Sequence, residues 1–164
     1  MSGHKLEAFI LNHRGAEMLP DDLRHLHRFG LSDHLTVAPV TRQLLQEVVA
    51  TFGEYKAEDD PYEDSLLTRL LPPLIQMAVK ASSVSAVLYY EIDVWSGIGD
   101  QSAIVWHKGE AVYGPTWGRS QVNEAFRLFG QLEGLPPDWA AELRLSRHSF
   151  TEDWVQEIES ESGQ

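Results

Sequence analysis

The chain contains no cysteine. It therefore has no disulfide framework, no thiol nucleophile and no thiolate zinc site. Long apolar segments are also missing, because the longest uncharged run, around residues 70–79, holds two prolines and is far too short to span a bilayer. The start "MSGHKLEAF" lacks the apolar region and the small-residue cleavage site of a signal peptide. We therefore expect a cytoplasmic protein without a membrane-spanning segment, and the alternative is an exported protein without cysteine, which would share these features.

Catalytic and ligand-binding motifs are equally scarce. The "GIG" of residues 97–99 has no third glycine at the dinucleotide-binding spacing, and a strand rather than a helix is expected after it. No G-x-S-x-G sequence supplies a hydrolase nucleophile. His25 and His27 are two residues apart, which on a helix directs them to different sides and is poor for a shared metal. We expect no metal and no cofactor.

Negative charge dominates, with 25 acidic against 13 basic residues and a net charge of −12. Two short segments supply ten of the twelve excess charges. Residues 152–161 contain five carboxylates and no cation. Residues 54–64 contain one cation, Lys56, and six carboxylates: Glu54, Glu58, Asp59, Asp60, Glu63 and Asp64. The chain is thus a nearly neutral body with two acidic segments.

This charge distribution limits the classes of partner. Negative potential repels nucleic-acid phosphates and anionic lipids, because binding to either requires cations. It attracts basic protein surfaces and accelerates their association. Acidity also keeps a protein soluble without any binding role, and the sequence leaves that alternative open.

The pattern of apolar residues and turn signals predicts helices before a β-meander and helices after it, which is the α+β class. We expect a single domain with a small antiparallel meander at about residues 84–114, an exposed acidic loop at 54–64 and a polar tail at 160–164. Residues 4–12 are too short to assign as strand or helix. The expected strands are residues 83–95, 102–107 and 110–114. The expected helices are residues 19–30, 41–53, 65–83 with a break at the double proline and a new helix from Pro73, 120–130, a short one after 137, and one from 151. In the second of these helices Thr41 is the expected cap, and the expected apolar stripe is Leu44, Leu45, Val48, Val49 and Phe52. Gly130 is the expected end of the helix at 120–130.

Two carboxylates stand out in the stretch "EIDVW". Alternate residues of a strand share a face, so Glu91, Asp93 and Trp95 lie together, and we expect this face to meet solvent or a groove. Such a pair suits acid–base chemistry or a hard cation. It is equally typical of an ordinary solvent-facing strand.

All five tryptophans follow residue 94. Most are expected in the core, where aromatic rings bury the largest area. Trp95 and Trp117 stand beside glycine-containing turns and are the ones we expect at the surface. Aromatic side chains close to carboxylates are typical of an interface for a basic protein.

The run "AVLYYEIDVWSGIGDQSAIVW", followed by "EAVYGP" and later by "RHSFTEDW", resembles a pattern found in small bacterial proteins of the immunity-protein type. The resemblance covers about residues 86–154 and includes no catalytic signature. It implies an α+β protein that neutralises a toxin by binding it.

We therefore predict an immunity or antitoxin-type protein that occludes a basic partner, for example a nuclease toxin. The predicted contact residues are Glu58, Asp59, Asp60, Glu91, Asp93, Trp95, Asp100 and Trp117. The alternatives are a small enzyme or divalent-metal-binding protein that uses Glu91 and Asp93, and a regulatory scaffold.

Overall fold

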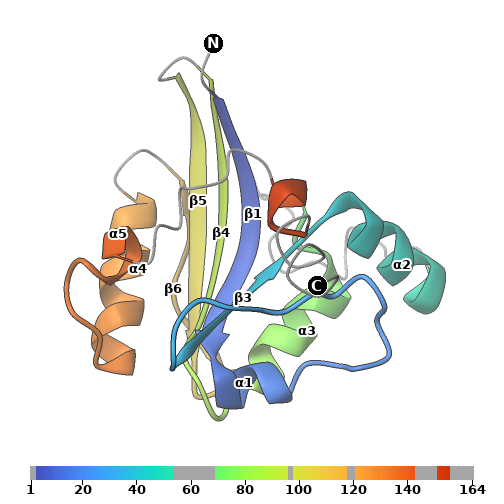
Figure 1. Ribbon diagram of the computed structural model, residues 1–164, viewed down its shortest axis with the longest axis horizontal. Helices are drawn as coiled ribbons and strands as arrows, with labels where there is room; N and C mark the ends of the chain where they lie inside the picture. Colours follow the sequence, from blue (N-terminus) through green and yellow to red (C-terminus); the bar gives the residue numbers. More distant parts are fainter. Residues whose placement is uncertain (1–2, 54–68, 96–97, 118–120, 143–150, 156–164) are drawn as a thin grey trace, which may run out of the picture.

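The computed structural model describes residues 3–53, 69–95, 98–117, 121–142 and 151–155. Its centre is an antiparallel sheet with the strand order β2-β3-β1-β4-β5-β6 (Figure 1). The strands are β1 (Gly3–Asn12), β2 (Phe29–Gly30), β3 (Leu35–Pro39), β4 (Val87–Trp95), β5 (Ile98–His107) and β6 (Glu110–Trp117). The helices are α1 (His13–Glu17), α2 (Arg42–Phe52), α3 (Pro72–Ala81), α4 (Gln121–Glu133) and α5 (Trp139–Glu142), with a further helical turn at residues 151–155. The α+β class is confirmed.

Helices cover both faces of the sheet. One layer contains α1, α2 and α3, and the opposite layer contains α4 and α5 (Figure 1). The central strands are accordingly apolar on both faces. Phe9 and Tyr89 pack under the first layer, whereas Ile10 and Tyr90 pack under the second. All four side chains are buried. Both faces of β4 therefore reach a core, where the sequence predicted only one.

The sheet is larger than the predicted meander. β4, β5 and β6 form that meander as expected, but β1 inserts beside β4 and brings β3 and β2 with it. The pairing of β1 with β4 runs from Gly3 opposite Trp95 to Leu11 opposite Val87. The start of β1, the end of β4 and the start of β5 extend beyond the helical layers (Figure 1). We call these three strand ends the projecting arm.

The helix predicted for residues 19–30 is wrong. Turns occupy this segment, and its end forms β2. Leu23 and Leu26 are buried in the core. The Arg28 guanidinium donates to the carbonyl oxygens of Leu19 and Pro20 at 2.9 and 3.0 Å. A side chain thus satisfies backbone groups that a helix would have paired, so the segment needs no regular structure.

The helix predicted after Thr41 is confirmed. The Thr41 hydroxyl accepts from the Leu44 amide at 3.1 Å, and Gly53 ends α2 with a φ of 82°. The predicted apolar stripe is only partly buried, because Phe52 and Val49 are 55% and 37% exposed. The helix predicted after the double proline begins at Pro72, one residue earlier than expected.

Gly130 does not end α4 as predicted. The helix continues to Glu133, and Gly134, with a φ of 69°, follows its last residue. Gly130 instead makes room for Trp139, because a Cβ there would lie 2.7 Å from the indole Nε1. That Nε1 donates to the Phe126 carbonyl at 3.0 Å, which holds the ring against the helix.

Two of the predicted features lie outside the described residues: the acidic loop at 54–64 and the tail at 160–164. Within the described part of the chain, no helix has the length and apolarity needed to cross a membrane.

Gly130→Ala is expected to destabilise the protein by about 1–3 kcal/mol in a urea unfolding measurement, because the new methyl group overpacks the Trp139 contact. Alanine favours a helix over glycine by about 1 kcal/mol. A net loss of unfolding free energy in the variant would therefore come from the steric effect. Gly30→Ala is the control, since a Cβ there meets nothing within 4 Å. Unchanged or increased stability of the Gly130 variant would contradict this packing.

Candidate functional site

Two acidic residues face each other inside the protein. Glu7 on β1 lies opposite Glu91 on β4, on the sheet face under α2 and α3. Their exposed fractions are 2% and 7%. A buried carboxylate is costly unless hydrogen bonds and opposite charge replace its water, so this pair requires partners.

Arg69 supplies the opposite charge. Its Nη1 lies 3.4 Å from Glu7 Oε2 and 3.4 Å from Glu152 Oε1, and it donates to the Val40 carbonyl at 2.9 Å. The Arg69 backbone amide donates to Glu91 Oε2 at 3.0 Å. The same residue therefore binds one carboxylate through its side chain and the other through its main chain.

Hydroxyl groups complete the arrangement. The Tyr89 hydroxyl donates to Glu91 Oε2 at 2.6 Å. The Thr151 hydroxyl donates to Glu7 Oε2, and its oxygen accepts from the Glu7 amide at 3.0 Å. The printed register of β3 against β1 ends at Ala8, and beyond it the Glu7 carbonyl accepts from the Val40 amide at 2.9 Å. The Glu7 amide pairs instead with the Thr151 hydroxyl. We call Glu7, Glu91, Arg69, Tyr89 and Thr151 the buried carboxylate cluster.

Burial governs the pKa values in the cluster. Desolvation raises the pKa of Glu7, against the opposing effects of the Thr151 hydroxyl and the Arg69 charge. Desolvation also raises the pKa of Tyr89 well above its usual value, so its hydroxyl keeps the proton that it donates. For Glu152, desolvation is outweighed by backbone hydrogen bonds and Arg69, and its pKa is lowered.

The expectation that Glu91 faces solvent or a groove is wrong. Glu91 and Asp93 share a face of β4, as predicted, but only Asp93 is exposed. The neighbour of Glu91 inside the protein is Glu7, which sequence reasoning missed because residues 4–12 received no assignment. Among the described residues, no group of three or more His, Asp or Glu side chains is arranged to hold a metal ion.

The fold brings three of the predicted contact positions together and leaves Trp117 apart from them. Asp100 on β5 lies opposite Asp93 in the register, and Trp95 ends β4 beside them, so three predicted positions meet in the projecting arm. Trp117 ends β6, where it pairs with Ser102. The structure describes the backbone of Trp95, Asp100 and Trp117. Glu58, Asp59 and Asp60 lie outside the described residues.

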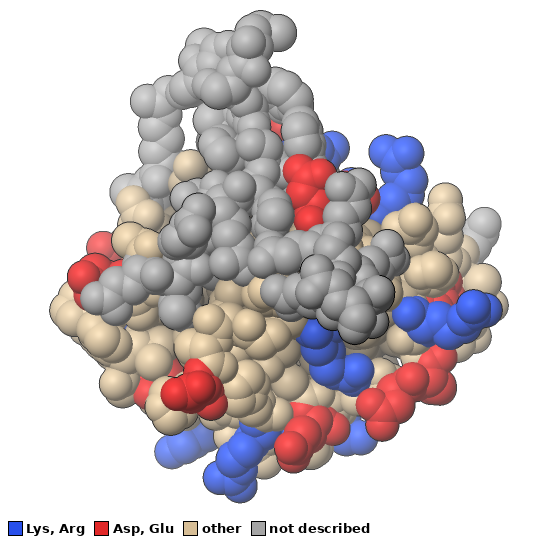
Figure 2. Space-filling view, viewed as in Figure 1, with Lys and Arg blue, Asp and Glu red and all other residues tan. Residues whose placement is uncertain are grey.

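On the face shown in Figure 2, acidic and basic side chains of the described residues are interspersed. This mixed surface agrees with the sequence, in which residues 54–64 and 152–161 supply most of the excess negative charge. The chain reaches both segments from the buried carboxylate cluster. Arg69 follows Asp64 by five residues, and Thr151 directly precedes Glu152.

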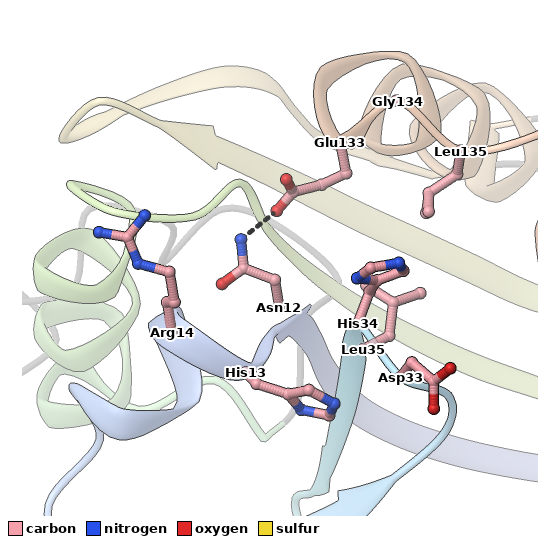
Figure 3. A pocket seen from close by; sticks show the side chains of 9 residues that line it. All are labelled: Asn12, His13, Arg14, Asp33, His34, Leu35, Glu133, Gly134 and Leu135. Carbon is pink, nitrogen blue, oxygen red and sulfur yellow. Dashed lines mark hydrogen bonds between the residues drawn. The ribbon is translucent and has the colours of Figure 1, made fainter.

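A polar pocket of about 360 Å³ lies at the other end of β1 (Figure 3). Its walls come from the junction of β1 and α1, the start of β3 and the end of α4. Its lining residues are Asn12, His13, Arg14, Asp33, His34, Leu35, Glu133, Gly134 and Leu135. We call it the Glu133 pocket. Sequence reasoning missed it, because its residues come from three separate segments and form no motif.

Hydrogen bonds hold the floor of this pocket in place. The side-chain Nδ2 of Asn12 donates to Glu133 Oε1 at 3.0 Å. The side-chain Oδ1 of Asn12 accepts from the backbone amide of Gly15 at 2.8 Å. Ser85 Oγ lies 3.0 Å from the same Glu133 oxygen. The His13 ring lies between Thr36 Oγ1 at 2.6 Å and the Ser32 carbonyl at 2.9 Å.

No protein-family model matches the chain, and no curated protein or solved structure matches it either.

Glu7→Gln tests the raised pKa of Glu7. Because the folded-state pKa lies above the unfolded value, the folded wild type binds the extra proton, and its stability relative to the variant should fall as pH rises through that pKa. The difference in unfolding free energy should level off at pH values below the usual pKa of a glutamate, where both the folded and the unfolded state are protonated. Denaturant unfolding of both proteins over a pH series measures it. A constant difference throughout would contradict the assignment.

Glu91→Lys and Asp93→Lys form a matched pair on one face of β4. The first places a cation among buried groups and is expected to lower the unfolding free energy by about 3–5 kcal/mol. The second changes an exposed residue and should alter it by less than about 1 kcal/mol. Thermal and urea unfolding measure both. Equal effects of the two substitutions would contradict the buried position of Glu91.

Proposed function

We propose that this protein binds a basic protein partner in the manner of an immunity or antitoxin protein, and that binding occludes the partner's functional surface. A nuclease toxin is a partner of suitable chemistry, because the cations that it uses for phosphate are complementary to carboxylates.

The observation that carries the proposal is that two described residues next to the acidic segments, Arg69 and Thr151, lie together at the buried carboxylate cluster. Arg69 leads back to the acidic residues 54–64, and Thr151 leads directly into residues 152–161. Both are attached to the sheet at Glu7 and Glu91. The described residues that border the two segments thus lie together, although the segments are far apart in the sequence. An excess of negative charge steers a basic partner toward the protein.

The projecting arm also supports the proposal, because it extends from the body of the protein and carries two further acidic positions. It extends past both helical layers (Figure 1), and Asp93 on β4 stands directly opposite Asp100 on β5. Like charges opposite each other in an antiparallel pair lower stability. Local costs of this kind are retained at functional sites. We assign the contact surface to Asp93, Trp95 and Asp100, and we give buried Glu91 the role of anchoring the base of the arm.

The test begins with capture of a partner from an extract of the source cells at low and high salt. The expected result is one basic protein, retained in stoichiometric amount and weakened by salt. Its dissociation constant is then measured by calorimetry. The double substitution Asp93→Lys and Asp100→Lys should weaken binding by about tenfold or more, since charge reversal opposes a basic surface.

Glu17→Lys is the matched control. Glu17 is an exposed acidic residue on α1, at the end of the sheet opposite the arm (Figure 1). The Glu17→Lys substitution should leave the dissociation constant nearly unchanged. Failure to capture a basic protein at either salt concentration, or equal weakening by both variants, would overturn the proposal. Binding without inhibition of the partner's activity would favour a regulatory scaffold instead.

A further inference from the structure

The Glu133 pocket presents a half-buried carboxylate at its centre. Oε1 of Glu133 is occupied by the Asn12 amide and by Ser85 Oγ. No described residue donates to Oε2, so this oxygen is available to a ligand. Asp33 adds a second carboxylate to the lining. A cationic hydrogen-bond donor, such as an ammonium group, fits this centre.

Arg14 lies to one side of the Asn12–Glu133 hydrogen bond (Figure 3). It is exposed, and among the described residues its guanidinium forms no hydrogen bond or ion pair. A guanidinium presents parallel donors that match the two oxygens of a carboxylate. This side of the pocket therefore suits an anionic group.

Leu135 and His34 lie on the other side of the same hydrogen bond (Figure 3). Leu135 is held where α4 ends, since its amide donates to the Gly130 carbonyl at 2.7 Å. Leu35 also lines the pocket. A leucine side chain and an imidazole ring together offer contact to an apolar group.

From this arrangement we propose that the pocket binds a free α-amino acid with an apolar side chain. The ammonium group binds Glu133 Oε2, the carboxylate binds Arg14, and the side chain packs against Leu135 and the ring of His34. The volume of about 360 Å³ falls in the range of small-molecule sites. The floor is already held by hydrogen bonds, so little ordering opposes binding.

Contacts to the ammonium group, the carboxylate and the side chain at once can be made by only one enantiomer of the amino acid. The probe is L-leucine, titrated into the isotope-labelled protein and followed by the amide NMR shifts of the pocket residues. D-Leucine, isopentylamine and 4-methylpentanoate each disrupt one part of the recognition. Saturable shifts with L-leucine are expected, with affinity for each analogue lower by about tenfold or more.

Arg14→Gln should reduce the affinity for L-leucine and leave that for isopentylamine unchanged, because the amine has no carboxylate to bind. Arg24→Gln, a change at another exposed arginine, is the control and should have no effect. The proposal is overturned if L-leucine and L-phenylalanine cause no saturable shift at about 10 mM, a concentration that detects even millimolar affinity. It is also overturned if the two arginine variants behave alike.

This pocket is independent of the partner surface proposed above. The charge-reversed arm variant, Asp93→Lys with Asp100→Lys, should bind L-leucine like the wild type. Loss of amino-acid binding in that variant would contradict the separation of the two sites.

Discussion

The ion pair between Glu7 and Arg69 is the interaction on which the arrangement of this protein depends. It lies inside the molecule at 3.4 Å, with Glu91 directly opposite Glu7 on the next strand. Two buried carboxylates on neighbouring strands repel each other. The guanidinium of Arg69 and the backbone amide of the same residue offset that repulsion. The same contacts join three separate parts of the chain, namely the sheet, residue 69 and the helical turn at residues 151–155.

β1 connects the two ends of the protein. Its first residues belong to the projecting arm, its middle carries Glu7, and its last residue, Asn12, forms part of the floor of the Glu133 pocket. Helices cover both faces of the central strands (Figure 1), and the residues in the middle of β1 and β4 are buried, whereas Asp93 near the end of β4 is exposed. A surface for a large partner and a pocket for a small ligand can therefore coexist at opposite ends of one strand.

Local signals in the sequence predicted much of the fold. The Thr41 cap, the helix after the double proline and the β4–β5–β6 meander depend on neighbouring residues, and all three are present. The helix predicted for residues 19–30 is absent, and the Arg28 side chain donates to the carbonyl of Leu19, nine positions earlier, in place of a helical hydrogen bond. The helix end predicted at Gly130 is wrong, because this glycine makes room for Trp139, which lies nine residues further along the chain.

The sequence by itself determined the class of fold, the excess of negative charge and the shared face of Glu91 and Asp93, since composition and strand alternation are local properties. Only the tertiary structure decided which of these two carboxylates is buried. That outcome depends on Glu7, on Arg69 and on Thr151, which bonds to Glu7 across 144 positions of the chain. Hydrogen bonds between such distant residues leave no periodic pattern in the sequence, because each partner satisfies the other only after the chain has folded.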